Sequence, residues 1–387
     1  MSDGKSSDGF PVVGIVGGGQ LARMMVQAAI PLGIEVRVLA EHADDGAARV
    51  ASQVDIGSPI DPDALRAFAA KCDIITLDHE LVDVETLQEI EASGTPVRPG
   101  PRALLFAKDK LHQRTEFAAA GLPVPVFEGA GGSGVIAFAA RHDWPVIAKA
   151  QRGGYDGRGV WVVPSLPDSA KVQREAQKRG LTLMLEEFVH IKRELAVIVA
   201  RRPSGEAVTY PIVETVQRDG ICHEVIAPAE VPAEVAEQAR ELGLRIAELT
   251  GAVGIIATEL FWTEDGRIVI NEVATRPHNS GHFTIDGCVT SQFENHLRAV
   301  LDWPLGPTDL TAPSVVMANL LGTDEESLAP RVASTLAADA GVRPYLYGKQ
   351  SRPGRKIGHV NVLGDDAGET RDRARRAALM LTGGTNG

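Results

Sequence analysis

Cysteine is scarce in this chain of 387 residues. Cys72, Cys222 and Cys288 stand far apart and form no CxxC pair, so the sequence indicates neither a disulfide framework nor a thiolate zinc site. The chain also lacks an uninterrupted apolar run long enough to span a membrane. From these absences we expect a protein of the reducing cytoplasm that has no membrane partner.

Positive charge is also in short supply. The formal net charge is −12 at pH 7, which argues against binding nucleic acid through a broad basic face but allows a local anion site. The apolar and charged fractions are those of an ordinary globular protein, and the length predicts two or three domains. Residues 1–10 are mostly polar, and we expect a disordered tail there.

Strand-like and helix-like runs alternate in the first part of the chain, as in "VVGIVG" followed by "QLARMMVQAAI". This alternation predicts an α/β domain at 11–108, with a parallel sheet covered by helices on both faces. A single helical stretch, "ALLFAKDKLHQRTEFAAAG", is expected next. We assign 109–305 to a second domain, which includes a small, mobile α+β part at 123–190 and a long helix over 233–250. Residues 306–387 are expected to form a smaller third domain.

The first glycine loop, "GIVGGGQLARM", follows a strand and opens a helix. Gly17, Gly19 and Ala22 match the G-x-G-x-x-A pattern of a dinucleotide fold, and Glu41 lies near the position of a ribose-binding acid. A helix N-terminus can equally bind the phosphate of another ligand, or the glycines can serve strand-to-helix packing alone. These residues by themselves leave the three interpretations open.

The second glycine loop, "AKAQRGGYDGRGVWVV", lies between two strands and is not followed by a helix. Glycines let backbone N–H groups close on anionic oxygens, and Lys149, Arg152 and Arg158 add positive charge. We therefore predict a hairpin flap over a triphosphate. The alternative, a solvated hairpin tip, gives no reason for Tyr155 and Asp156 among the glycines.

A hairpin is predicted in "ATELFWTEDGRIVINEVA". The Asp-Gly pair at 265–266 favours a two-residue type I′ turn, which would pair Glu264 with Arg267. Counting outward from that turn places Glu259 opposite Glu272, with their Cβ atoms about 5 Å apart.

Two carboxylates that face each other in a largely apolar hairpin repel, unless a proton or a divalent cation lies between them. Asn271 adds another oxygen ligand beside the pair. We predict Mg²⁺, which Mn²⁺ could replace, bound by Glu259 and Glu272 together with substrate phosphates. The alternative is that Glu259 pairs with an arginine elsewhere and Glu272 caps the strand.

Three other segments carry candidate site residues. The segment "ATRPHNSGHFT" follows the hairpin. Its Arg276, His278 and Asn279 are candidates for the reacting end of the site, where the second substrate would meet the activated group. In "LMLEEFV", the adjacent acids at 186–187 end an apolar strand and suggest a nucleotide hinge. The basic loop "RPGRKIGH" would, on its own, be interpreted as a solvated turn.

Taken in chain order, these segments resemble the ATP-grasp superfamily. More narrowly, "GGGQLARM", "GGYDGRGVWVV", "EVATRPHNSGHFT" and "RPGRKIGH" resemble the N5-carboxyaminoimidazole ribonucleotide synthetase family, over about Val12 to Leu363. The resemblance implies an ATP-grasp fold, a homodimer, and ATP and magnesium bound between the central and C-terminal parts. For the first glycine loop, the resemblance favours a site for a nucleotide monophosphate over a site for NAD.

The resemblance also implies roles for individual residues. Around ATP it places Lys110, Lys149, Gly153, Gly154, Tyr155, Asp156, Gly157, Arg158, Gly159, Glu186, Glu187, Phe188, Val189, Glu194, Gln217, Asn271 and Glu272. Around the ribonucleotide phosphate it places Gly18, Gly19, Gln20, Leu21, Lys349, Arg355 and Lys356, with Glu80 as a carboxylate that contacts the substrate. The catalytic set near the ring amine is Tyr155, Asp156, Arg276, His278 and Asn279.

The implied reaction is the ATP-dependent carboxylation of 5-aminoimidazole ribonucleotide by bicarbonate, through carboxyphosphate, in purine biosynthesis. Asp156 or a phosphate oxygen would accept the amine proton. The sequence departs from the family at Gln217, where relatives usually carry histidine, and at Asp78, where they carry glutamate. The alternatives are a formate-dependent glycinamide ribonucleotide transformylase, an NAD-dependent dehydrogenase, and a nucleotide-binding regulatory protein without activity.

Overall fold

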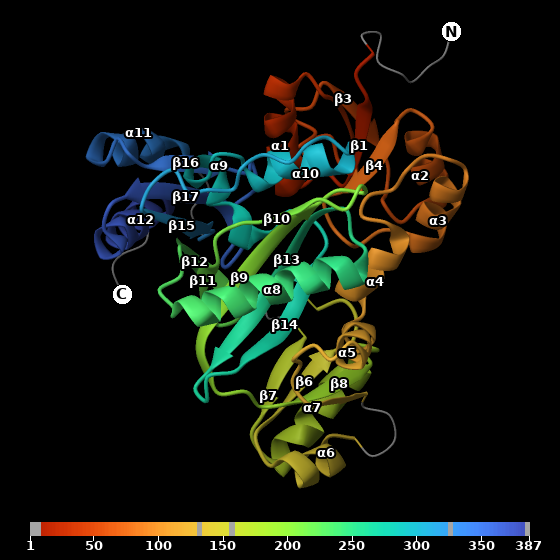
Figure 1. Ribbon diagram of the computed structural model, residues 1–387, viewed down its shortest axis with the longest axis vertical. Coiled ribbons are helices and arrows are strands. Elements are labelled where there is room, and N and C mark those ends of the chain that lie inside the picture. The colour runs from red at the N-terminus through yellow and green to blue at the C-terminus, as the bar shows by residue number, and fades with distance from the viewer. Residues whose placement is uncertain (1–8, 130–133, 155–158, 324–327, 384–387) are drawn as a thin grey trace.

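The computed structural model describes residues 9–129, 134–154, 159–323 and 328–383 (Figure 1). Most of the expected tail at 1–10 and the flap tip, Tyr155 to Arg158, therefore lie outside the described residues. Among the helices of these ranges, none combines the length and the apolar character that a membrane span requires.

The N-terminal sheet is parallel, as the alternating pattern predicted, and its strand order is β3-β2-β1-β4. Its strands are β1 (Val12–Val16), β2 (Glu35–Ala40), β3 (Gln53–Ile56) and β4 (Ile74–Leu77). Helix α1 (Gln20–Ala29) packs on one face, and α2 (Pro62–Ala69) and α3 (Val84–Ala92) pack on the other. Strand β3 was not predicted, because it is a short edge strand whose residues are not buried.

The single helix expected after this domain is in fact two helices, α4 (Pro101–Lys108) and α5 (Lys110–Ala119). Asp109 interrupts them with an extended backbone, φ −128° and ψ 104°. Its carboxylate accepts hydrogen bonds from the N–H groups of Leu111 and His112 and so caps the start of α5. These side-chain hydrogen bonds favour a new helix start at Asp109 over one continuous helix. The break places Lys110 at the first position of α5.

A small antiparallel sheet follows, with strand order β5-β8-β6-β7. It consists of β5 (Phe127–Gly129), β6 (Val146–Ala150), β7 (Val160–Val163) and β8 (Leu183–Glu187), and it carries α6 (Gly134–His142) and α7 (Leu166–Lys178). Strands β6 and β7 pair directly, with Lys149 opposite Val160, so the predicted flap hairpin is present. This part forms the lower end of the molecule in Figure 1.

The central sheet has the order β14-β13-β9-β11-β12-β15-β17-β16, and β10 pairs with β9. Its strands are β9 (Ile191–Arg201), β10 (Ala207–Thr209), β11 (Val213–Arg218), β12 (Ile221–Ala227), β13 (Gly254–Thr263), β14 (Ile268–Ala274), β15 (Ser314–Leu321), β16 (Arg343–Leu346) and β17 (Lys356–Gly364). Because β15 pairs with β12, the strands of 306–387 extend the sheet of the central part. Helices α11 (Ala329–Ala338) and α12 (Ala367–Thr382) belong to this end.

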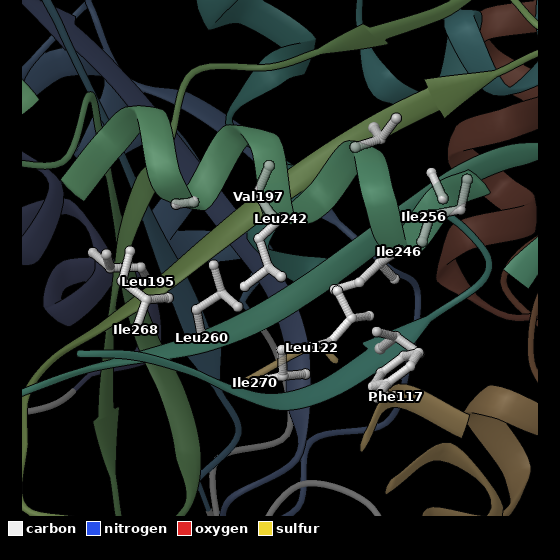
Figure 2. Close-up of a cluster of buried hydrophobic side chains, with 14 of the residues drawn as sticks. Phe117, Leu122, Leu195, Val197, Leu242, Ile246, Ile256, Leu260, Ile268 and Ile270 are labelled. Atoms are coloured by element: carbon white, nitrogen blue, oxygen red, sulfur yellow. The ribbon is translucent and has the colours of Figure 1, made fainter. Parts of the chain in front are cut away.

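Helix α8 (Ala233–Thr250) has the bounds that the sequence predicted. Val235, Ala239, Leu242 and Ile246 form its buried stripe, and Gly251 ends it in the left-handed conformation at φ 64°. The stripe packs on Leu195, Val197, Leu260 and Ile270 of β9, β13 and β14 (Figure 2). Full burial of one such leucine or isoleucine contributes about 1.5–3 kcal/mol. This core fixes one face of β13 and β14, and the opposite face is available for the site.

Candidate active site

A cavity of about 700 Å³ lies between the small sheet and the central sheet. Many of the residues expected around ATP line this cavity. They are Lys110, Lys149, Glu186, Glu187, Phe188, Val189, Glu194, Gln217, Asn271 and Glu272. The lining also includes Glu259, His278, Asn279 and Lys356. The described flap glycines, Gly153, Gly154 and Gly159, are not part of this lining. The structure thus brings together side chains that were predicted from segments far apart in the chain.

The hairpin turn at Asp265-Gly266 differs from the predicted two-residue turn. Thr263 donates its N–H to the carbonyl of Arg267, and Gly266 has φ 87°, so the loop contains three residues. The pairing near the turn is therefore shifted by one residue, with Trp262 opposite Ile268.

A β-bulge at Asn271 then shifts the register back, and Glu259 lies opposite Glu272 as predicted. Leu260 and Ile270 point into the core beneath α8, so their neighbours Glu259 and Asn271 point to the cavity. Strict alternation would turn Glu272 back toward the core. Because the bulge adds one residue, Asn271 and Glu272 both line the cavity.

The two facing glutamates have opposite protonation tendencies. Burial raises the pKa of Glu259 above the usual carboxyl range, and the charges of Glu272 and Glu194 raise it further. The charge of Lys110 lowers the pKa of Glu272, to which its ammonium group is hydrogen-bonded. Asn271 Nδ2 donates to Glu259 Oε2 at 3.4 Å. The positive charge around the pair thus stabilises the ionised form of Glu272 but does not offset the burial of Glu259.

Lys149 belongs to a buried ionic network. Its Nζ lies 2.7 Å from Glu186 Oε2 and donates to Asn271 Oδ1 at 3.1 Å. Arg114, which sequence reasoning missed, donates through Nε to Glu186 Oε1 at 2.6 Å and through Nη2 to the carbonyl of Asn271 at 2.6 Å. The side chains of Arg114 and Glu186 are only 1% and 3% exposed. One guanidinium therefore joins α5, the end of β8 and the bulge of β14.

The electrostatics of this network fit its geometry. Burial alone would raise the pKa of Glu186, but the charges of Arg114 and Lys149 outweigh it and lower the pKa to about 2. Burial lowers the pKa of Lys149, and the attraction of Glu186 opposes that shift. Lys149 is thus held at the cavity wall by an ionised carboxylate and an amide oxygen.

The two acids at the end of β8, Glu186 and Glu187, have different partners. Glu186 is occupied by the ionic network, and Glu187 Oε1 accepts the N–H of Val126 at 3.1 Å. Glu194 lies on β9, on the same face as Glu259, and lines the cavity. Burial raises the pKa of Glu194 to about 7. Glu194 therefore changes its protonation state near neutral pH.

The loop after β14 carries the residues expected at the reacting end. Arg276 Nε lies 2.9 Å from Glu80 Oε1, so the structure joins these two candidates. His278 Nε2 lies 3.7 Å from Glu259 Oε1. Gln292, at the start of α10 (Gln292–Val300), receives the N–H of His278 at 3.0 Å and donates to its carbonyl at 2.7 Å. The loop is thereby fixed beside the carboxylate pair.

The expected phosphate site at the start of α1 is partly occupied by a carboxylate of the protein itself. Asp78 accepts the N–H groups of Gly19 at 2.6 Å and Ala22 at 2.9 Å. Gln20 Oε1 receives a hydrogen bond from Lys349 Nζ, so two of the residues expected around the phosphate do meet. Arg355 is exposed and donates to the carbonyl of Gln350 at 3.3 Å, and Lys356 lines the cavity.

The fold and the cavity define an ATP-grasp protein, which is an ATP-dependent ligase. The family model of the ATP-grasp domain matches residues 115–293, that of the ribonucleotide synthetase preATP-grasp domain matches 11–108, and that of the phosphoribosylaminoimidazole carboxylase C-terminal domain matches 315–373. Within this class, the chain belongs to the N5-carboxyaminoimidazole ribonucleotide synthetase family.

Individual relatives support this assignment over nearly the whole chain. The N5-carboxyaminoimidazole ribonucleotide synthase of Mycobacterium tuberculosis is 50% identical over 97% of this chain and 88% of its own. The carboxyaminoimidazole ribonucleotide synthase of Aspergillus clavatus, solved with ATP, is 31% identical with a TM-score of 0.89, over 96% and 98% of the two chains. The Aspergillus clavatus enzyme with ADP and 5-aminoimidazole ribonucleotide is 30% identical with a TM-score of 0.87, over 98% and 99%.

Proposed function

We propose that this protein uses ATP to carboxylate 5-aminoimidazole ribonucleotide with bicarbonate, and that it forms N5-carboxyaminoimidazole ribonucleotide, ADP and phosphate in purine biosynthesis. The observation that carries this proposal is the facing pair Glu259 and Glu272, which shares one cavity with Lys149 and the loop of His278 and Asn279. The groups that we expect to bind phosphate thus line the same cavity as His278 and Asn279, two candidate groups for the second substrate.

The pair fits Mg²⁺. Glu259 has a pKa raised by burial and by Glu272, which is the arrangement that a divalent cation would relieve. Within the described ranges, no three His, Cys, Asp or Glu side chains form a metal-binding group, so two carboxylates would share the ion with substrate phosphates. When bound, the ion would neutralise charge on the transferring phosphoryl group.

The remaining chemistry falls to the side chains. Lys149 and Lys110 would bind phosphate oxygens of ATP, and the Glu194 carboxylate would accept hydrogen bonds from the ribose hydroxyl groups. A bicarbonate oxygen forms a bond to the γ-phosphorus as the bond to ADP breaks, which gives carboxyphosphate. Carboxyphosphate then breaks into phosphate and carbon dioxide, and the substrate amine captures the carbon dioxide as a carbamate.

The groups at the amine end would position and deprotonate the amine. Arg276, His278 and Asn279 would hold the imidazole ring near the carboxylate pair. The amine proton would pass to Asp156, which lies outside the described residues, or to a phosphate oxygen. A closed site would keep water from the activated intermediate. We further propose domains at 11–108, 109–305 and 306–387, a homodimer, and a cytoplasmic location.

Phosphate release from ATP tests the proposed function. With bicarbonate and magnesium present, we expect release to depend on 5-aminoimidazole ribonucleotide and to match the carboxylated product in amount. Release that requires formate and glycinamide ribonucleotide would instead identify the transformylase. A change in nicotinamide absorbance would identify the dehydrogenase, and no turnover with any substrate would identify a binding protein.

Glu194 predicts a specific pH dependence of ATP binding. The ionised carboxylate accepts ribose hydroxyl hydrogen bonds, and this form is lost as the pH falls through about 7. The affinity for ATP should therefore fall below that pH, by up to about tenfold per pH unit. In Glu194→Gln, calorimetric titration should find weaker binding and a loss of this part of the pH dependence. A pH profile identical to that of the unmodified protein would contradict the assignment.

A further inference from the structure

Asn319 is a buried polar side chain in strand β15, where its neighbours Ala318 and Leu320 are apolar. Its amide makes three hydrogen bonds to two residues that line the cavity. Nδ2 donates to the carbonyl of Cys222 at 2.9 Å and to Asn279 Oδ1 at 2.8 Å, and Oδ1 accepts from Asn279 Nδ2 at 3.0 Å. Asn319 thus connects strand β12, strand β15 and the loop of the reacting end.

The carbonyl of Cys222 sets the direction of these hydrogen bonds. A backbone carbonyl can only accept, so the Asn319 nitrogen must face it. The Asn319 oxygen then faces Asn279, where it requires a donor. The Asn279 amide is therefore held with its nitrogen toward Asn319 Oδ1 and its oxygen toward Asn319 Nδ2. An isolated terminal amide could exchange its nitrogen and oxygen by rotation, but this pair prevents that.

The same pair leaves part of the Asn279 amide unused by Asn319. An amide has two N–H donors and two acceptor lone pairs on its oxygen. After the reciprocal pair, one N–H and one lone pair of Asn279 are left over, and Asn279 lines the cavity. We infer that Asn319 is a positioning residue, which fixes the Asn279 amide so that this N–H and lone pair meet the aminoimidazole ribonucleotide in one defined orientation.

This inference rests on the proposed function, and it gives the C-terminal strands a part in substrate recognition. Gln292 fixes the backbone of His278, and Asn319 fixes the side chain of the next residue. Breaking this contact is unfavourable, since a buried amide that loses its partners leaves unsatisfied polar groups.

Asn319→Asp tests the inference with almost no change in volume. The carboxylate lacks the donor, so it repels the carbonyl of Cys222 and the oxygen of Asn279. We expect the KM for aminoimidazole ribonucleotide to rise about tenfold or more, corresponding to about 1.4 kcal/mol. The ratio of carboxylated product to phosphate should fall, and the KM for ATP should stay within about twofold. Asn319→Ala, which buries no charge, should show the same pattern.

Asn295→Asp is the matched control. Asn295 is also buried, and its amide pairs with Tyr210 and with the backbone of Gly306, away from the cavity lining. The Asn295→Asp substitution should lower the melting temperature but leave the KM for the ribonucleotide and the ratio of product to phosphate unchanged. A merely structural role for Asn319 predicts the same result for Asn319→Asp, and that result would overturn the inference.

A double-mutant cycle tests whether Asn319 acts through Asn279. In an Asn279→Ala background, Asn319→Asp should change the substrate KM by less than about twofold, since the amide that it positions is gone. Effects that multiply would overturn the inference. If the unmodified protein releases no phosphate in response to the ribonucleotide, the proposed function itself fails. Normal turnover with unaltered Asn319→Asp kinetics contradicts only the positioning role.

Discussion

Glu259→Gln is expected to reduce ATP-dependent carboxylation about 10³-fold, which is typical of losing a group that stabilises phosphoryl-transfer charge. The same substitution should make the ligand-free protein more stable. Glu259 faces Glu272, and burial and that charge raise its pKa. Glutamine keeps the shape and removes the repulsion, so the gain in unfolding free energy should be about 1–3 kcal/mol near neutral pH.

The pH dependence of this gain has a defined sign. Because the folded protein raises the pKa of Glu259, it binds that proton more tightly than the unfolded chain does. Wild-type stability is therefore lost as the pH rises from the usual carboxyl range through the raised pKa. Urea unfolding without metal or ATP should show the advantage of Glu259→Gln growing with pH over that interval. Glu248→Gln, at an exposed position on α8, should show no such trend, and a destabilised Glu259→Gln would contradict the account.

Arg114→Met is expected to destabilise the protein by about 3–5 kcal/mol, the cost of breaking a buried ion pair from one side. Arg114 is 1% exposed and supplies hydrogen bonds to Glu186 and to the carbonyl of Asn271. Without it, a buried carboxylate retains Lys149 as its partner, and the bulge of β14 loses a donor. Chemical denaturation should show a much lower midpoint with an unchanged slope.

Two further variants separate the buried charge from the loss of packing. Arg267→Met removes the exposed pair with Asp265, where the arginine is 59% exposed, and should change the stability by less than about 1 kcal/mol. Arg114→Met combined with Glu186→Met should not recover the loss, because the buried ammonium group of Lys149 then lacks its carboxylate partner. An Arg114→Met protein as stable as Arg267→Met would show that the network does not hold the site together.

The hairpin of Glu259 shows how far sequence reasoning reaches. The pairing with Glu272 was predicted correctly, although the assumed turn was one residue too short. The two differences cancel: the longer turn shifts the pairing by one residue, and the bulge at Asn271 in β14 shifts it back. Alternation of side chains cannot reveal a bulge, so the means by which two successive polar residues reach one cavity was visible only in the structure.

Other parts of the site depend on packing between distant segments. The stripe and closing glycine of α8 are local signals, and its bounds followed from them. Arg114 is one polar residue among many on a helix, and nothing local marks its burial against Glu186. Asn319 did carry a signal, since an amide inside the apolar run "VVMANLLG" requires a partner. Its partner Asn279 lies 40 positions earlier and could not be identified from the sequence.

Transfer of a bicarbonate oxygen into phosphate tests the central claim most directly. Bicarbonate labelled with heavy oxygen would be supplied with ATP, magnesium and 5-aminoimidazole ribonucleotide, and the released phosphate would be analysed by mass spectrometry. If a bicarbonate oxygen attacks the γ-phosphorus, each phosphate formed together with carboxylated product carries one labelled oxygen, and Glu259→Gln releases almost none. Phosphate that carries oxygen from water alone would contradict carboxyphosphate formation and, with it, the function proposed for this cavity.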